Sequence, residues 1–151
     1  MIYLKNFEQR DYRRVAPFLR KADVNEAKVL GYEVDFVLRL SLEVCTKRRW
    51  TVMDGSVPVG FVGVSDGGCI WAVGTDRMTL NWREFLRATR ETFDLVTGDF
   101  EVVGNFVHQS NHVHIRWLEW LGCVLDDPDH RGFRRFVCVP SQRRCPPSSK
   151  A

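Results

Sequence analysis

The chain has 151 residues, which fits one ordinary domain with a core of its own, and its 44% hydrophobic and 27% charged residues are typical of soluble globular proteins. No apolar run approaches the roughly 18–20 residues of a membrane span, so no such span is expected. Arg143, Arg144 and Lys150 account for the net charge of +3, and the remainder balances 19 basic against 19 acidic residues, which makes nucleic-acid binding unlikely as the main role.

The amino terminus runs from Met1 directly into polar residues, without the pattern of a signal peptide. Five cysteines are scattered along the chain without a CxxC pair, at Cys45, Cys69, Cys123, Cys138 and Cys145. An odd, scattered set argues against a secreted disulfide framework and against a structural zinc site. We therefore expect reduced, mostly buried thiols and a cytosolic protein.

Hydrophobic spacing predicts the secondary structure in chain order. It gives a strand at 1–6, a helix at 8–21, a second helical segment at 26–44 that Gly31 interrupts, strands at 50–53, 58–64 and 69–74, a helix at 82–96, a strand at 101–107, a helix at 111–121, and a closing hairpin of 123–125 with 133–139. Asp54-Gly55 is the strongest hairpin signal, Asp23 or Asn25 is expected to cap the second helix, and Gly122 is a typical glycine after a helix end.

The resulting order, β-α-α-β-β-β-α-β-α-β-β, predicts an α/β protein with a mixed sheet that helices cover on both faces. Residues 1–139 form the predicted domain. Residues 140–151 have no apolar pattern and are predicted to be a flexible tail.

This order is similar to that of the GNAT (acyl-CoA N-acyltransferase) fold, in which the fourth and fifth strands splay apart and acyl-CoA lies between them. The segment 111–123 resembles the GNAT pattern N-x-x-A-[IL]-x-L-Y-x-[KR]-x-G-F, with Asn111, Ile115, Leu121 and Gly122 in register. The resemblance implies that Gly74 ends the central strand and that a gap opens between residues 70–74 and 102–107.

A narrower resemblance covers residues 1 to about 139. The segments 19–31 and 71–76 and the helix at 111 look like those of GNAT-like proteins of short-tailed phages, a group that includes the internal virion protein A type and relatives classed as acetyltransferases. It implies a phage-encoded protein that binds a host or virion protein, located in the host cytoplasm and in part incorporated in the virion.

The GNAT resemblance also implies acyl-CoA contacts at Val73, Gly74, Arg77 and Asn111. The chain departs from the family at the turn that holds the CoA pyrophosphate, [RQ]-x-x-G-x-[GA], where residues 74–82 place Asp76 and no further glycine. Backbone N–H groups and a helix amino terminus normally bind that anion. We therefore expect acetyl-CoA binding to be weak or undetectable.

A second departure concerns the general acid. Many GNAT enzymes have a tyrosine seven residues after the asparagine, and here that position is Leu118, which cannot donate a proton. His114 on the same helix face, His108 on the adjoining strand and Glu26 near the usual acceptor entry are the candidate catalytic residues. His114 can equally be a space-filling residue, and Asp23 and Glu26 can equally serve their own helix. No metal site is expected, because the histidines at 112 and 114 point to different helix faces.

Three functions remain open from the sequence. The first is a phage structural or assembly protein on a GNAT scaffold with a degenerate acyl-CoA site. The second is an acyl-CoA-dependent N-acetyltransferase with a non-standard cofactor site, and the third is a phage effector that binds a host protein without chemistry. Fold alone does not choose among them, because function depends on the site.

Overall fold

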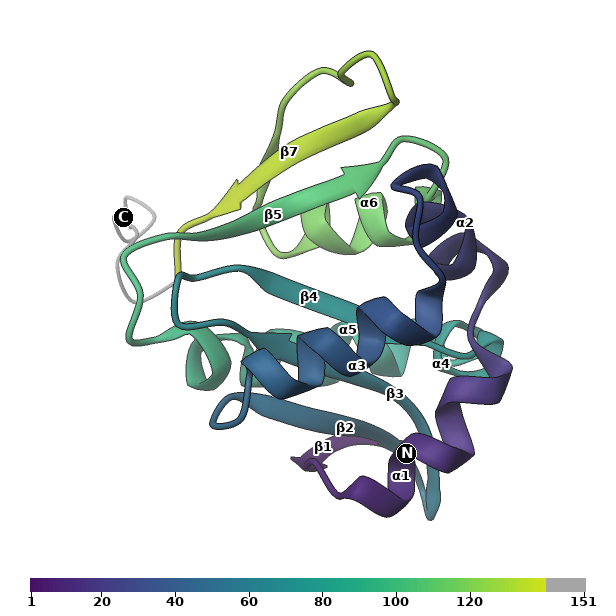
Figure 1. Cartoon of the computed structure of the whole chain (residues 1–151). Coiled ribbons are helices and arrows are strands. Elements are labelled where there is room, and N and C mark those ends of the chain that lie inside the picture. The colour runs from purple at the N-terminus through teal and green to yellow at the C-terminus, as the bar shows by residue number, and fades with distance from the viewer. Residues whose placement is uncertain (141–151) are drawn as a thin grey trace, which may run out of the picture.

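The computed structural model describes residues 1–140, so that Cys145 and nearly all of the predicted tail, from residue 141 on, lie outside the described residues. The chain order of elements follows the prediction, except that the second helical segment is divided into α2 and α3 and that a short helix α4 and a 3₁₀ turn η1 are added (Figure 1). The elements are β1 (Ile2–Asn6), α1 (Gln9–Val15), η1 (Ala16–Phe18), α2 (Lys21–Val29), α3 (Val34–Val44), β2 (Arg49–Asp54), β3 (Val57–Val64), β4 (Ile70–Gly74), α4 (Asp76–Leu80), α5 (Trp82–Thr97), β5 (Val103–His108), α6 (His112–Trp120), β6 (Val124–Leu125) and β7 (Phe133–Cys138).

The strands form two antiparallel sheets, β1-β2-β3-β4 and β5-β7-β6. The predicted hairpin at Asp54-Gly55 joins β2 to β3, with Gly55 at a φ of 61° that favours glycine. A single parallel bridge between Cys69 and Gly104 connects the two sheets. Beyond this bridge β4 and β5 diverge, as Figure 1 shows, and β4 ends at Gly74. The splayed GNAT-like arrangement and the predicted end of the central strand are therefore confirmed.

The side chain of Asn105 lies where pairing between β4 and β5 stops. Its Nδ2 donates to the carbonyl of Ile70 (3.1 Å), and its Oδ1 accepts from the main-chain N–H of Phe106 (2.8 Å). In a continued parallel ladder, the Phe106 N–H would itself bond to the Ile70 carbonyl. The amide of Asn105 thus satisfies both groups at the point where the strands begin to separate.

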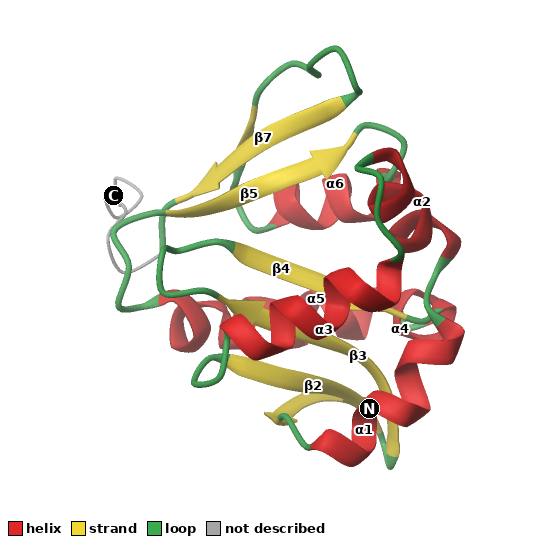
Figure 2. Cartoon of the chain, in the orientation of Figure 1, coloured by secondary structure: helices red, strands yellow, loops and turns green. Residues whose placement is uncertain are grey.

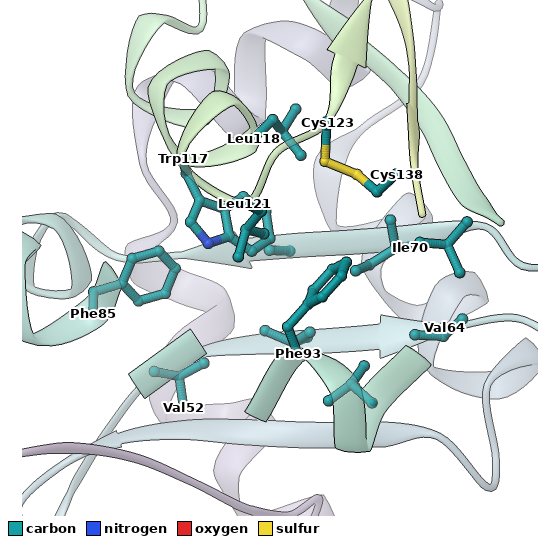
Figure 3. Packing of buried hydrophobic residues seen from close by; sticks show 14 of the residues in the cluster. Val52, Val64, Ile70, Phe85, Phe93, Trp117, Leu118, Leu121, Cys123 and Cys138 are labelled. Carbon is teal, nitrogen blue, oxygen red and sulfur yellow. A yellow bond between two sulfur atoms is a disulfide. The ribbon is translucent and has the colours of Figure 1, made fainter. Parts of the chain in front are cut away.

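Helices cover both faces of the four-stranded sheet (Figure 2). On one face α1 and α3 pack around a cluster of Val15, Leu38, Leu42 and Phe61. On the other face α5 and α6 pack on a larger cluster, in which Phe85, Phe93 and Trp117 lie against strand residues such as Val52 and Ile70 (Figure 3). Burial of these apolar side chains is the main stabilising contribution to the fold.

One pair of cysteines corrects the sequence analysis. Cys123 and Cys138 form a disulfide that ties the loop before β6 to the end of β7 (Figure 3), although reduced thiols were expected at both positions. Cys123 directly precedes β6 and Cys138 ends β7, the strand that pairs with β6, and the spacing of the cysteines along the sequence does not reveal this pairing. Cys45 is a free, buried thiol as expected, and Cys69 is free but exposed.

The helix boundaries around residue 20 differ from the prediction. The predicted interruption at Gly31 separates α2 from α3, but α2 begins at Lys21 and not at residue 26, with Arg20 at its N-cap position and no side-chain cap. Asp23 and Asn25 therefore lie inside α2, and the prediction that either caps it is wrong. Asp23 does not cap α2 because tertiary contacts engage its carboxylate, which bonds to Arg20 and to the main-chain N–H of Gly74.

Candidate functional site

A cavity of about 640 Å³ lies between the separated strands β4 and β5 and the helices α2, α3 and α6. Most of the side chains that line it are apolar. Its volume and lining are those of a binding pocket for a small molecule or a peptide segment. Three of the predicted site residues, Glu26, Val73 and His114, line this cavity, whereas His108, Gly74, Arg77 and Asn111 do not.

Asp23 joins α2 to the end of β4. Its carboxylate accepts hydrogen bonds from Arg20 Nη2 (2.9 Å) and from the main-chain N–H of Gly74 (3.1 Å). The Gly74 carbonyl in turn accepts from the main-chain N–H of Arg20 (2.8 Å). Both Arg20 and Asp23 are buried, so the pair is a desolvated ion pair. Both main-chain groups of Gly74, a predicted acyl-CoA contact, are thus bonded within the protein.

Glu26 lies one helical turn after Asp23 and joins α2 to the other sheet. Its Oε1 accepts from the main-chain N–H of His108 at the end of β5 (3.0 Å) and from Asn111 Nδ2 (2.9 Å). Burial raises the pKa of the Glu26 carboxyl above its usual value, although both hydrogen bonds oppose that rise. The structure therefore brings Glu26, His108 and Asn111 together around one carboxylate oxygen, which the sequence did not predict. Their hydrogen bonds connect α2 to the end of β5 and the start of α6.

His114 lies on α6 with 7% of its surface exposed, and its main-chain N–H bonds to the capping Oδ1 of Asn111 (3.4 Å). Burial lowers the pKa of His114 to about 4, so the ring is neutral near pH 7. Within residues 1–140 its Nε2 has no hydrogen-bond partner. As predicted, it shares a helix face with Leu118, which also lines the cavity. A buried neutral imidazole can accept or donate one hydrogen bond to a ligand here.

His108 is placed differently from the expectation of a cavity residue. Its Nδ1 lies 2.7 Å from Ser110 Oγ, and its Nε2 lies 3.0 Å from the carbonyl of Arg131. Both ring nitrogens are thus engaged in holding the loop after β5 against the loop before β7. Within the part of the chain that the structure describes, no group of three His, Cys, Asp or Glu side chains is placed to hold a metal ion.

The turn from β4 into α4 does not form the cradle that a CoA pyrophosphate requires. Arg77 Nε donates to Asp54 Oδ2 (2.9 Å), so its guanidinium is paired within the protein. Met78 is fully buried, and its Sδ would lie 2.6 Å from a Cβ added at Gly74, which shows how closely the thioether fills the turn. Asp76 adds a carboxylate to the first turn of α4, which repels phosphate. The residues present do not fit the pyrophosphate.

An exposed apolar stripe borders the cavity. Phe36, Leu40 and Val44 recur at four-residue spacing on α3, and each is between 49% and 56% exposed. Tyr32 stacks on Phe36 with ring centroids 5.7 Å apart, and Phe106 on β5, 57% exposed, lies on the opposite side of the cavity. We call Tyr32, Phe36, Leu40, Val44 and Phe106 the apolar rim. Exposed apolar side chains that gather around a cavity in this way are typical of interaction sites in soluble proteins.

Some of these features were missed from the sequence. Asn105 is a polar residue in an apolar strand, and a buried polar group needs a partner. That signal was present in the sequence, but the Ile70 carbonyl that Asn105 bonds lies 35 positions away, and the Gly74 N–H that Asp23 bonds lies 51 positions away, so both contacts required the fold. The indole N–H groups of two tryptophans also have partners: Trp117 Nε1 donates to Thr89 Oγ1 (3.0 Å), and Trp71 Nε1 lies 3.3 Å from Cys45 Sγ.

Comparison with solved structures establishes the class. The chain is similar to the aminoglycoside acetyltransferase AAC(6')-Ib in complex with coenzyme A, at 16% identity and a TM-score of 0.65 over 95% of this chain and 96% of that one. A GNAT-family acetyltransferase from Streptococcus pneumoniae matches at 12% identity and a TM-score of 0.60, over 92% of this chain and 99% of that chain. An acetyltransferase from Thermus thermophilus matches at 15% identity and a TM-score of 0.62, over 92% and 97%. The protein has the GNAT fold.

The sequence places the chain more narrowly. Residues 50–129, more than half of the chain, match the family described as "Bacteriophage T7, probable scaffold protein Gp13", and the chain belongs to this family. No curated protein matches it in sequence. Within residues 1–140, none of the helices is long and apolar enough to cross a membrane.

Proposed function

We propose that this chain is a phage assembly protein that uses the GNAT fold to bind another protein and does not transfer acyl groups. The observation that carries the proposal is the apolar rim, which borders the cavity along α3 and at β5 with about half-exposed aromatic and aliphatic side chains. Interface cores are enriched in such residues and depleted in charge. The partner is a virion protein, with a host protein as the next candidate, and the place of action is the host cytoplasm and the assembling particle.

Two observations support this proposal over acyl transfer. The family of the chain is described as a probable scaffold protein of a phage, which is a role in assembly. The turn after β4 is filled by Met78, and Arg77 is paired with Asp54, so no side-chain cation is directed to a pyrophosphate. The cavity residues therefore favour contacts with a polypeptide over contacts with a charged cofactor.

A second candidate is an acyl-CoA-dependent N-acetyltransferase with a non-standard cofactor site. Glu26 favours it, because a buried carboxylate with a raised pKa beside the split strands can act as a general base. Calorimetric titration of the full chain with acetyl-CoA separates the candidates. Submicromolar binding would favour the enzyme.

The assembly role is tested by complementation. A phage that lacks this gene is grown on cells that supply the wild-type chain or the double variant Leu40→Ser/Val44→Ser, and the proteins of purified particles are quantified by mass spectrometry. We expect the rim variant to lower the plaque titre at least about tenfold, because central interface residues dominate binding energy. Leu80→Ser/Leu95→Ser is the matched control, since both leucines are exposed (80% and 78%) away from the cavity. Equal titres for both variants, with equal thermal stability, would contradict the proposal.

A further inference from the structure

One residue of β4 presents main-chain groups to the cavity. Main-chain groups alternate between the two sides of a strand, and Thr75 N donates to Val59 O in β3 (2.9 Å), so the even-numbered residues of β4 face the gap. The Ile70 carbonyl accepts from the side chain of Asn105, the Gly74 N–H donates to the carboxylate of Asp23, and the Gly74 carbonyl accepts from the main-chain N–H of Arg20. Ala72 lies between them and directs one N–H and one C=O into the gap. No side chain within residues 1–140 hydrogen-bonds to either.

The cavity reaches both faces of this strand edge. Val37 and Val73 line it on the α3 side, whereas Ile70, Trp117 and Leu118 line it on the α6 side. Successive side chains of an extended peptide point to opposite faces. A peptide that enters the gap therefore places its side chains alternately in two apolar half-pockets. A helix, about 10 Å across, has no such alternation and does not match this shape.

The charge of the cavity lining limits which ligands can bind in it. Glu26 lies at the α2 end of the cavity, where Oε1 holds two hydrogen bonds. No Lys or Arg of the described residues lies within ion-pair distance of this carboxylate. The other charged side chains that line the cavity are Asp23, which is paired with Arg20, and the oppositely charged Asp129 and Arg131. Glu26 therefore repels an acidic ligand, accepts a neutral one and is complementary to a basic one.

We propose that the gap between β4 and β5 binds an extended, apolar, neutral or basic peptide segment of the partner protein. The main chain of this segment pairs with the N–H and C=O of Ala72, and its side chains alternate between the two half-pockets. The distance from Ile70 to Gly74 corresponds to roughly 13 Å of strand, so about four peptide residues fill the gap. This proposal rests on the proposed function and adds the chemistry of the recognised segment.

The test uses the full chain and a random dodecapeptide library displayed on filamentous phage. Selected peptides are synthesised with a fluorescein label, and their affinities are measured by fluorescence anisotropy. We expect selected sequences in which apolar residues alternate and acidic residues are rare. In a scan of single N-methylated peptides, methylation of the residue opposite Ala72 should weaken binding by about tenfold, because it removes one buried hydrogen bond. Sequences with helical spacing, or a scan without a sensitive position, would overturn the proposal.

Two variants of α3 provide the matched comparison. Val37→Trp places a large side chain in the α3 half-pocket, and Glu43→Trp places the same side chain on the exposed side of the helix. We expect Val37→Trp to weaken peptide binding at least about tenfold and Glu43→Trp to leave it unchanged. Circular dichroism and thermal unfolding confirm that each variant is folded. Equal affinities for Val37→Trp and the wild type would overturn the proposal.

The complementation experiment keeps this proposal distinct from the proposed function. If the rim variant abolishes particle assembly but no extended peptide binds, the partner docks on the rim in another form, and only the inference of this section fails. If peptides bind but the rim variant assembles normally, the gap is a peptide site and the assembly role fails.

Discussion

The side-chain amide of Asn105 donates a hydrogen bond to the carbonyl of Ile70 across 3.1 Å, at the point where the two halves of the sheet cease to pair. The same amide accepts the N–H that would otherwise continue the ladder. One side chain therefore closes the narrow end of the gap on both of its edges.

This relationship predicts the effect of Asn105→Ala. The substitution leaves the Ile70 carbonyl and the Phe106 N–H without their partner, and we expect a loss of about 1–2 kcal/mol in the free energy of unfolding. Urea denaturation measures the loss, and hydrogen exchange at the Phe106 amide should become faster. Gln109→Ala, at an exposed position after β5, is the control. Unchanged exchange at Phe106 would mean that Asn105 does not hold the strand end.

The buried pair of Arg20 and Asp23 predicts an asymmetry between single and double variants. Asp23→Ala leaves the Arg20 guanidinium buried without a counter-charge and removes the partner of the Gly74 N–H. We expect it to cost about 3–5 kcal/mol of unfolding free energy. The double variant Arg20→Leu/Asp23→Leu should cost less than Asp23→Ala, because no buried charge remains unpaired. A double variant less stable than the single one would contradict this account.

His114 predicts a loss of stability in acid. Its folded pKa of about 4 lies below the ordinary value of 6.5, so the unfolded chain binds a proton more readily than the folded one. The stability that this difference contributes is present above pH 6.5 and is lost as the pH falls toward 4, by up to about 3 kcal/mol. His114→Leu should lose this part of the pH dependence, whereas His112→Leu, exposed on the same helix, should retain it. Unfolding titrations from pH 7 to 4 measure both. Parallel profiles for His114→Leu and the wild type would refute the prediction.

Glu26 predicts a pH dependence of the unfolding free energy with the opposite sign to that of His114. Burial raises its folded pKa above the ordinary value of 4.5, so the folded state binds the proton more tightly than the unfolded one. The contribution of Glu26 to stability is therefore greatest below pH 4.5 and declines as the pH rises through the folded pKa. We expect Glu26→Gln to remove this decline, since an amide oxygen still accepts the bonds from His108 and Asn111. Glu43→Gln, at an exposed position, should follow the wild type in the same unfolding titration. If Glu26→Gln keeps the decline, its carboxyl is not the group that titrates.

The filled turn after β4 predicts weak cofactor binding. We expect calorimetry to show acetyl-CoA affinity that is weak or undetectable for the wild-type chain. Asp54→Asn releases Arg77 from its ion pair and should raise the affinity, by up to about tenfold, because a guanidinium becomes available to phosphate. Asp127→Asn, at an exposed position, is the control. Submicromolar binding by the wild type would show that the turn accommodates phosphate despite Asp76 and Met78.

The elements that the sequence predicts best are those with local chemical signals. The hairpin at Asp54-Gly55 and the helix between Asn111 and Gly122 are placed correctly, because turn and cap residues act on their immediate neighbours. The start of α2 is missed by about five residues, since Asp23 serves Gly74 and not its own helix. Local propensity contains no information about such a contact.

The candidate site is predictable in part for the same reason. The resemblance placed Glu26 and His114 beside the separated strands, and both line the cavity. It did not predict that Glu26 would bond to His108 and Asn111, because these contacts join segments more than 80 residues apart. The disulfide between Cys123 and Cys138 was missed because an odd number of cysteines argued against any pairing.

Asp23 and Glu26 lie three positions apart on α2, and each accepts a hydrogen bond from the last residue of a different strand. Asp23 bonds the N–H of Gly74 at the end of β4, and Glu26 bonds the N–H of His108 at the end of β5. Helix α2 therefore connects the two strands across the open end of the gap, and less than one turn of this helix sets the distance between the strand ends. An α-helix advances about 100° per residue, so inserting a single residue between positions 23 and 26 would swing one carboxylate away from its strand. The spacing of the two strand ends thus depends on the helical geometry of α2, and lengthening that helix by one residue would break one of the two contacts.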